Sequence, residues 1–134
     1  MGFQNDDSAT LLRQARTIAV VGLSDSPDRD SYRVARYLIQ VGYTIFPVNP
    51  GIDEVMGVKS YKSLLDVPES VDIVDVFRRP EYVPQIVEAA IQTGARALWL
   101  QFGVIHAAAA KQARDAGLKV VMDRCIKIDH AMMG

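Results

Sequence analysis

Residues 17–22 read Thr-Ile-Ala-Val-Val-Gly, a short run of apolar and β-branched residues that ends on a glycine. Four more apolar runs follow along the chain, at residues 43–48, 71–76, 97–100 and 119–122. Continuous apolar runs of this length are typical of strands buried on both faces, as in parallel sheets. We therefore predict a sheet of five parallel strands.

Helix-length segments with apolar residues at helical spacing separate these runs, at residues 31–41, 85–93 and 107–116. A glycine follows each segment, as is common where a helix ends: Gly42, Gly94 and Gly117. A further amphipathic helix is predicted before the first strand, over residues 8–15, with Asp6, Asp7 or Ser8 as its N-cap. Residues 51–68 interrupt the alternation, and a short helix at residues 63–65 capped by Ser60 is predicted there.

Alternating strands and helices indicate an α/β fold, a Rossmann-like open parallel sheet with helices on both faces. The chain has 134 residues, of which 49% are hydrophobic, so we expect one domain over residues 1–134. The 15 basic and 16 acidic residues leave a net charge of -1, which does not favour a general nucleic-acid binder. No apolar run is long enough to span a membrane and the polar N-terminus is not a secretory signal, so we expect a cytoplasmic protein.

Residues just after the strands are the first candidates for a site, because ligands of such sheets bind outside the carboxyl ends of the strands. After the first strand, Gly22 is followed by Ser24 and Ser26, and Ser31 opens the next helix. Free backbone N–H groups at a helix start form an anion site, to which Arg29, Arg33 and Arg78 would add charge. The alternative is an ordinary turn whose serines cap the helix.

Two known nucleotide-binding patterns are missing from this loop. The dinucleotide fingerprint needs three glycines, but Ser24 and Pro27 stand at the later two positions. Its acidic partner is expected at the end of the second strand, where the chain has Asn49. No Gly-Lys-Ser/Thr follows the first strand, so a P-loop is absent as well. These departures disfavour NAD.

The motifs along the chain are Ile18–Ser24 with Pro27, Ser31-Tyr32, Tyr37-Leu38, Gly42-Tyr43, Pro47–Pro50, Tyr61–Leu64, Val71–Arg78, Trp99–Val104 and Val121–Lys127. Together they resemble the small stand-alone coenzyme A-binding proteins with a Rossmann-like fold, over nearly the whole stretch from Thr17 to His130. The resemblance implies that the chain binds coenzyme A (CoA) or acyl-CoA.

A more distant likeness is to the CoA-binding domain of the α subunit of succinyl-CoA synthetase. That likeness implies that Leu23-Ser24 holds phosphate, that Asn49-Pro50 lies by the adenosine, and that Phe77-Arg78 lines the other side. It also implies that this chain corresponds only to the CoA-binding half of such an enzyme, since the ligase domain and its phosphorylated histidine are absent from the sequence. The candidate CoA-binding residues are Gly22, Leu23, Ser24, Pro27, Arg29, Ser31, Tyr32, Arg33, Asn49, Pro50, Phe77 and Arg78.

Cys125 is the only cysteine, which excludes an intramolecular disulfide and a multi-cysteine zinc site. It follows the fifth strand at the ligand-bearing edge, where a thiolate activated by His130 would be a nucleophile. The alternative is a buried, inert thiol. We predict no catalytic residue and no metal site. We also expect Arg79 to point away from Arg78, His106 to serve at a helix start, and Trp99 to lie in the core.

The leading hypothesis is a CoA- or acyl-CoA-binding protein of acyl-CoA metabolism without catalysis of its own. One alternative is a small enzyme, either an acyl transferase that uses Cys125 or an NAD(P)-dependent oxidoreductase. Another is a regulatory or scaffold subunit whose bound nucleotide is structural. No nucleic-acid or membrane partner is expected, and any protein partner is left open.

Overall fold

The computed structural model describes residues 3–133 and contains a five-stranded parallel sheet in the order β2-β1-β5-β6-β7. Its strands are β1 (Thr17–Val21), β2 (Thr44–Val48), β5 (Ile73–Val76), β6 (Ala97–Leu100) and β7 (Lys119–Met122). All five predicted strands are present, each within two residues of its expected ends. The predicted α/β class, with an open parallel sheet, is therefore confirmed.

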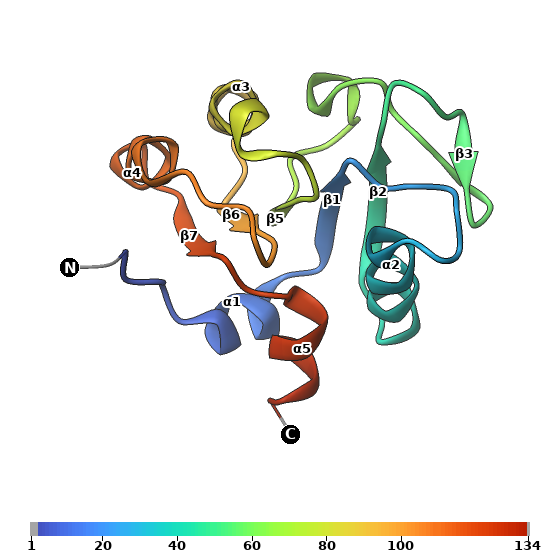
Figure 1. Ribbon diagram of the computed structural model, residues 1–134, viewed down its shortest axis with the longest axis horizontal. Coiled ribbons are helices and arrows are strands. Elements are labelled where there is room, and N and C mark those ends of the chain that lie inside the picture. Colours follow the sequence, from blue (N-terminus) through green and yellow to red (C-terminus); the bar gives the residue numbers. More distant parts are fainter. Residues whose placement is uncertain (1–2, 134) are drawn as a thin grey trace.

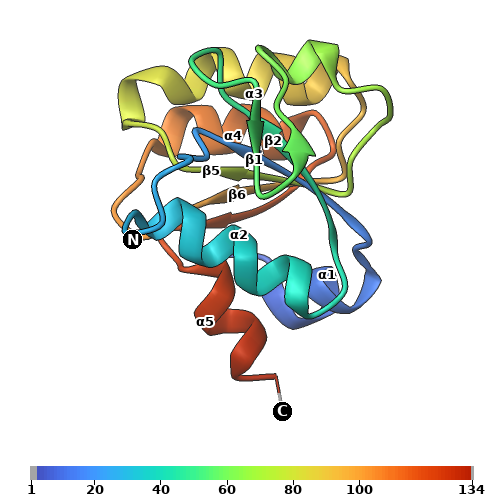
Figure 2. The same ribbon diagram turned by 90° about the vertical axis from the view of Figure 1, so that its right-hand side faces the viewer.

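Helices cover both faces of the sheet, as Figures 1 and 2 show. On one face lie α3 (Val83–Gln92) and α4 (Ala107–Asp115), and on the other lie α1 (Ser8–Gln14), α2 (Asp30–Gln40) and α5 (Ile126–Ala131). The helix α1 is capped by Asp7, whose carboxylate accepts the N–H groups of Ala9 and Thr10. The four predicted helices are thus confirmed.

The structure corrects the prediction in the segment between β2 and β5. The short helix there is the 3₁₀ turn η1 (Leu64–Asp66), and its N-cap is Ser63 rather than Ser60. Ser60 is buried and its hydroxyl donates to the carbonyl of Asn49. A two-stranded ribbon of β3 (Glu54–Val55) and β4 (Val58–Lys59) precedes η1 and was not predicted. A second 3₁₀ turn, η2 (Pro80–Tyr82), and the helix α5 were also not predicted.

Alternate side chains of each strand pack into two hydrophobic cores, one on each face, because successive residues point to opposite faces of a sheet. In β1, Ala19 and Val21 pack toward α3 and α4, whereas Ile18 and Val20 pack toward α1, α2 and α5. Trp99 lies fully buried in the second of these cores, as predicted. Asp75 of β5 is fully buried as well, between Val20 and Trp99 in the strand register.

The order of the strands places a topological switch beside β1. From β1 the chain crosses by α2 to β2 at the edge, and then returns to β5 on the other side of β1. The loops after β1 and β5 therefore diverge from neighbouring strand ends, which leaves a crevice at the carboxyl edge of the sheet. This edge carries the candidate site.

Candidate functional site

The loop after β1 begins with a glycine that its surroundings require. Gly22 has a φ of +89°, and a Cβ on it would lie 2.6 Å from the carbonyl oxygen of Phe77 and 2.9 Å from Cδ of Arg78. Only a residue without a side chain accepts both the conformation and this close approach. The loop after β1 is thereby held directly against the residues that follow β5.

Three serines shape the rest of this loop. The N–H of Ser24 donates to Oγ of Ser31 (3.0 Å), and the N–H of Ser26 donates to Oγ of Ser24 (3.0 Å). The hydroxyl of Ser26 in turn donates to the carboxylate of Asp28, and this bond lowers the pKa of Asp28. The capped-turn interpretation therefore accounts for part of the serine pattern.

The start of α2 remains open to an acceptor from outside. Its N-cap is Arg29, whose side chain forms no capping hydrogen bond, so the N–H groups of the first turn are available to an anion. Arg33 is already engaged, because its guanidinium donates to Asp30 Oδ1 (2.5 Å) and to the Asp28 carbonyl (2.7 Å). Arg29 forms no ion pair with any residue from 3 to 133. The charge left for a ligand here is therefore that of Arg29.

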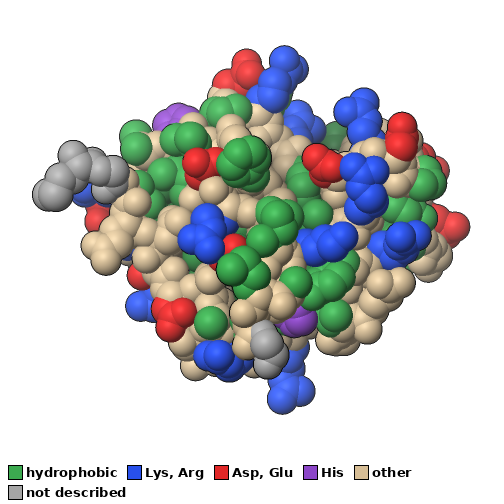
Figure 3. All heavy atoms as spheres, turned by 60° about the horizontal axis from the view of Figure 1, so that its bottom comes forward, with side chains coloured by type: hydrophobic (Ala, Val, Ile, Leu, Met, Phe, Trp, Pro, Cys, Tyr) green, Lys and Arg blue, Asp and Glu red, His purple; other side chains and the backbone are tan. Residues whose placement is uncertain are grey.

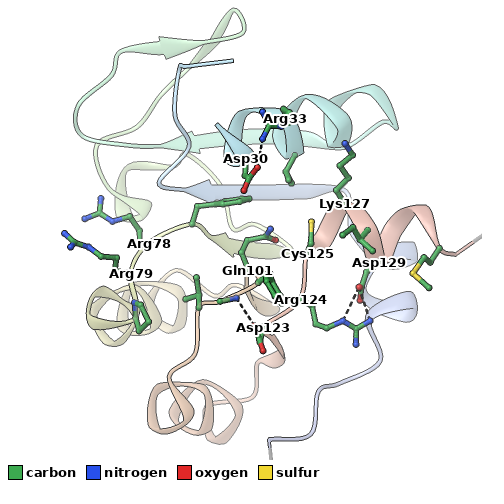
Figure 4. Close-up of a pocket in the computed structure, with 18 residues that line it drawn as sticks. Asp30, Arg33, Arg78, Arg79, Gln101, Asp123, Arg124, Cys125, Lys127 and Asp129 are labelled. Carbon is green, nitrogen blue, oxygen red and sulfur yellow. Dashed lines mark hydrogen bonds and ion pairs between the residues drawn. The ribbon is translucent and has the colours of Figure 1, made fainter. Parts of the chain in front are cut away.

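Arg78 supplies a second cation at the same place. It is half-buried, its Cδ lies beside Gly22, and its guanidinium stacks 4.4 Å from the ring centre of Tyr82. No carboxylate of residues 3–133 forms an ion pair with it. Arg79 was expected to point away from Arg78, and this expectation is wrong. Its guanidinium lies 5.8 Å from the centre of the same Tyr82 ring and is paired with Glu81. Figure 4 shows the two arginines side by side.

The loop after β2 is tied to the loop after β1 by Asn49. Its Nδ2 donates to the carbonyl of Leu23 (3.0 Å), and its Oδ1 accepts the N–H of Gly51 (2.8 Å). Pro50, beside it, lines a cavity of about 330 Å³ that lies between the ends of β1 and β2 and the helix α3. We call this the β2-side cavity, and Arg78 and Tyr82 form part of its wall.

Two further cavities open at the same edge. The loop cavity, of about 450 Å³, is lined by Gly22, Ser24, Asp28, Arg29, Asp30, Ser31 and Phe77. The large cavity, of about 960 Å³, lies between the first turn of α2, the ends of β5, β6 and β7, and α5 (Figure 4). Phe77 lines both, and Arg78 lines the large and β2-side cavities, so the three cavities meet at these two residues.

Eight of the twelve predicted ligand residues line one of these three cavities, namely Gly22, Ser24, Arg29, Ser31, Arg33, Pro50, Phe77 and Arg78. The other four do not. Leu23 is fully buried, Tyr32 packs against the core under α2, Asn49 is used between the loops, and Pro27 is exposed beside the site. Among these four, Leu23 has only its backbone to offer a ligand.

Apart from Cys125, which was considered as a nucleophile, the residues that form the far wall of the large cavity were not among the predicted ligand residues. They come from the ends of β6 and β7 and from α5, and include Gln101, Val104, Cys125, Ile128 and Met132. For Gln101 the sequence did contain a signal of a ligand contact, namely a polar residue directly after a buried strand. The α5 residues had none, because a helix of six residues is too short to show a clear periodicity.

Cys125 and His130 do not form a nucleophile pair. The Cys125 thiol is half-buried and lines the large cavity, whereas His130 lines a separate one and its Nδ1 bonds to the hydroxyl of Tyr37 (2.7 Å). His106 is the N-cap of α4 and accepts the N–H of Ala109, as expected of a helix start. Within residues 3–133, His, Cys, Asp and Glu side chains form no group of three or more suited to a metal ion.

None of the helices described here has both the length and the apolar character needed to cross a membrane. Figure 3 shows the face on which α5 lies, where apolar side chains are interspersed with basic and acidic ones. The exposed apolar residues include Phe102, Ile128 and Met132, at the rim of the large cavity.

Comparison with known proteins adds three findings. A family described as "CoA binding domain" matches residues 16–131. An uncharacterized protein of Bacillus subtilis, YneT, is 44% identical over 122 residues, which cover 91% of this chain and 90% of that protein. A hypothetical protein from Pyrococcus horikoshii has the same fold, with a TM-score of 0.93 and 39% identity over 98% of this chain and 93% of its own.

A similar segment also occurs inside larger enzymes. The α subunit of an ADP-forming acetate–CoA ligase from Pyrococcus furiosus is 35% identical over 95 residues, which cover 66% of this chain. The matched region is 21% of that subunit, so the matched part of this chain spans about a fifth of the ligase subunit's length.

Proposed function

Because this chain belongs to the CoA-binding domain family, we propose that it binds coenzyme A or an acyl-CoA at the carboxyl edge of its sheet. The observation that carries the proposal is the meeting of three cavities at Phe77 and Arg78, beside an uncapped helix start. CoA is a long ligand with an adenosine, a pyrophosphate and 3′-phosphate, and a neutral pantetheine arm. The phosphates need hydrogen-bond donors and positive charge, whereas the adenosine and the pantetheine arm need mainly apolar walls. The three cavities have different linings.

The phosphates belong in the loop cavity. The first-turn N–H groups of α2 would face an anion there, together with the guanidinium of Arg29, which forms no ion pair within residues 3–133. Arg78 lies next to this cavity, because its Cδ is beside Gly22, which lines it. The adenosine then occupies the β2-side cavity by Pro50, as in the related synthetase family. The pantetheine arm takes the remaining direction, past Phe77 into the large cavity.

Binding without chemistry is the function we assign. The thiol of Cys125 lines the large cavity, but His130 is bonded to Tyr37 instead. An NAD-dependent reaction is disfavoured because Asn49, at the position of the expected ribose-binding carboxylate, is already committed to Leu23 and Gly51. A role in acyl-CoA metabolism in the cytoplasm is part of the same proposal.

Isothermal titration calorimetry of the purified protein with CoA tests the proposal, with NAD at the same concentration as the control. We expect saturable binding of CoA and none of NAD. The variant Ser24→Asp should weaken CoA binding, because it places a carboxylate in the loop cavity where phosphate is expected. The absence of CoA binding, or tighter binding of NAD, would refute the assignment.

A further inference from the structure

Gln101 directs one fixed hydrogen-bond donor into the large cavity. It is the first residue after β6, and only 5% of its surface is exposed. Its Oε1 accepts the N–H of Ile126 at 3.1 Å, which identifies the other end of the amide as the NH₂ group. No residue from 3 to 133 accepts a hydrogen bond from this Nε2. The residue is nearly buried while its free Nε2 opens into the cavity, so a ligand that enters the cavity with an acceptor would be held at a fixed place.

The bond from the N–H of Ile126 also places Gln101 next to Cys125, because Cys125 directly precedes Ile126 in the chain. Figure 4 shows the side chains of Gln101 and Cys125 next to each other and pointing toward the same space. The free NH₂ group thus lies at the inner wall of the large cavity, close to a thiol. Both residues line that cavity.

The charges around Gln101 do not favour an anion at this end of the cavity. Arg124 is paired with Asp129 (3.0 Å), and Asp123 accepts the N–H of Gly103 (2.7 Å). Arg33 is paired with Asp30, and the ammonium of Lys127 lies 5.6 Å from the ring centre of Tyr37. Arg78 and Arg79 lie over the ring of Tyr82, at the end of the cavity formed by β5. Apolar side chains complete the wall near Gln101: Val34, Val104, Ile128 and Met132. A neutral donor beside apolar side chains, at the end of the cavity formed by β6, β7 and α5, matches a ligand segment that combines a carbonyl oxygen with methylene groups.

We propose that the large cavity holds the thioester end of an acyl-CoA, with Gln101 Nε2 donating to the thioester carbonyl oxygen and the apolar rim packing the acyl chain. This inference rests on the proposed function, because the phosphates in the loop cavity anchor the arm that enters past Phe77. It makes Gln101 the residue that distinguishes an acyl-CoA from free CoA. No bond is made or broken in the step, and Cys125 is a neighbour of the carbonyl rather than its nucleophile.

A pair of matched ligands isolates the carbonyl contact. Butyryl-CoA carries the thioester carbonyl, and S-butyl-CoA has the same chain length without it. Calorimetry on the unmodified protein should show butyryl-CoA bound roughly two- to tenfold more tightly, the range expected of one neutral hydrogen bond. Equal affinities would overturn the inference, and this comparison needs no variant.

The variant Gln101→Glu then tests the residue. Its carboxylate retains an acceptor for the N–H of Ile126, so the start of α5 keeps its partner, but at pH 8 the donor is lost. The added charge acts equally on the parts that both ligands share, and the carboxylate no longer attracts the carbonyl oxygen, so the ratio of the two affinities reports the carbonyl contact. We expect that ratio to fall to about one. A ratio that stays unchanged would overturn the inference. Failure of the unmodified protein to bind CoA at all would instead refute the proposed function.

Discussion

At the residue scale, Gly22 connects the fold to the site, because it allows the loop after β1 to touch the end of β5. Gly22→Ala should lower the free energy of unfolding by more than Gly117→Ala, which shares the positive φ but has open space around its Cα. The left-handed conformation alone costs about 1–2 kcal/mol for a residue with a Cβ. We expect at least about 1 kcal/mol beyond that at Gly22, measured by urea denaturation. Equal losses would mean that the close approach to Phe77 is easily relaxed.

Asp75 is the second informative residue, because its carboxyl group is fully buried and its two oxygens have no hydrogen-bonding partner among residues 3–133. This burial raises the pKa of Asp75 well above its ordinary value. The folded state therefore holds a proton that the unfolded chain releases above about pH 4. As pH rises beyond that point, the free energy of unfolding should fall, until the pKa of the folded state is reached.

The variant Asp75→Asn removes this titration while keeping the shape of the side chain. Its free energy of unfolding, relative to that of the unmodified protein, should increase with pH from about 4 upward, by at most about 1.4 kcal/mol per pH unit. Chemical denaturation at several pH values between 4 and 8 measures the difference. A difference independent of pH would show that Asp75 ionises in the folded state as it does in the unfolded chain.

Arg78 and Arg79 form a natural pair for testing the phosphate contacts. Arg78 is unpaired within residues 3–133 and lies against Gly22, whereas Arg79 is exposed and paired with Glu81. Arg78→Ala should weaken CoA binding about ten- to a hundredfold, the range expected for loss of a charge-assisted hydrogen bond. Arg79→Ala should change affinity less than about threefold. Similar effects of both variants would place the phosphates elsewhere.

At the element scale, α5 closes the large cavity and begins directly after Cys125. If the phosphates and adenosine supply most of the affinity, Cys125→Ser should keep CoA affinity within about threefold, which calorimetry measures. Incubation with butyryl-CoA followed by intact-mass measurement examines the thiol itself, and we expect no added acyl mass. Reproducible acylation of Cys125 would contradict binding without catalysis and support the acyl-transfer alternative.

At the scale of the whole molecule, the site is assembled from the loops after β1, β2, β5, β6 and β7. A ligand that spans these loops binds only the folded chain and so stabilises it. At a free CoA concentration 100 times the dissociation constant, linkage adds about 2.7 kcal/mol, on the order of 10 °C in melting temperature for a chain of this size. Thermal scans with CoA and with NAD measure it, and a larger shift with NAD would contradict the proposal.

The sequence by itself determined the sheet and its main helices, because hydrophobic periodicity and helix-ending glycines are local signals. The apolar runs at residues 97–100 and 119–122 coincide with β6 and β7 residue for residue. The same local pattern indicated Trp99 as a core residue and directed attention to the strand ends as the candidate site. The serine- and arginine-rich loop after β1 was recognised for the same reason.

Only the tertiary structure decided how those residues are used, since charge pairing and hydrogen bonding depend on where each side chain lies, both within one helix turn and between distant segments. Arg33 is paired with Asp30, whereas Arg29 and Arg78 form no ion pair within residues 3–133. From the sequence, all three arginines had been predicted to add charge to the anion site. The short helix α5 begins where Gln101, 25 residues earlier, accepts the N–H of Ile126. That long-range bond leaves the amide nitrogen of Gln101 as a donor, which no local pattern reveals.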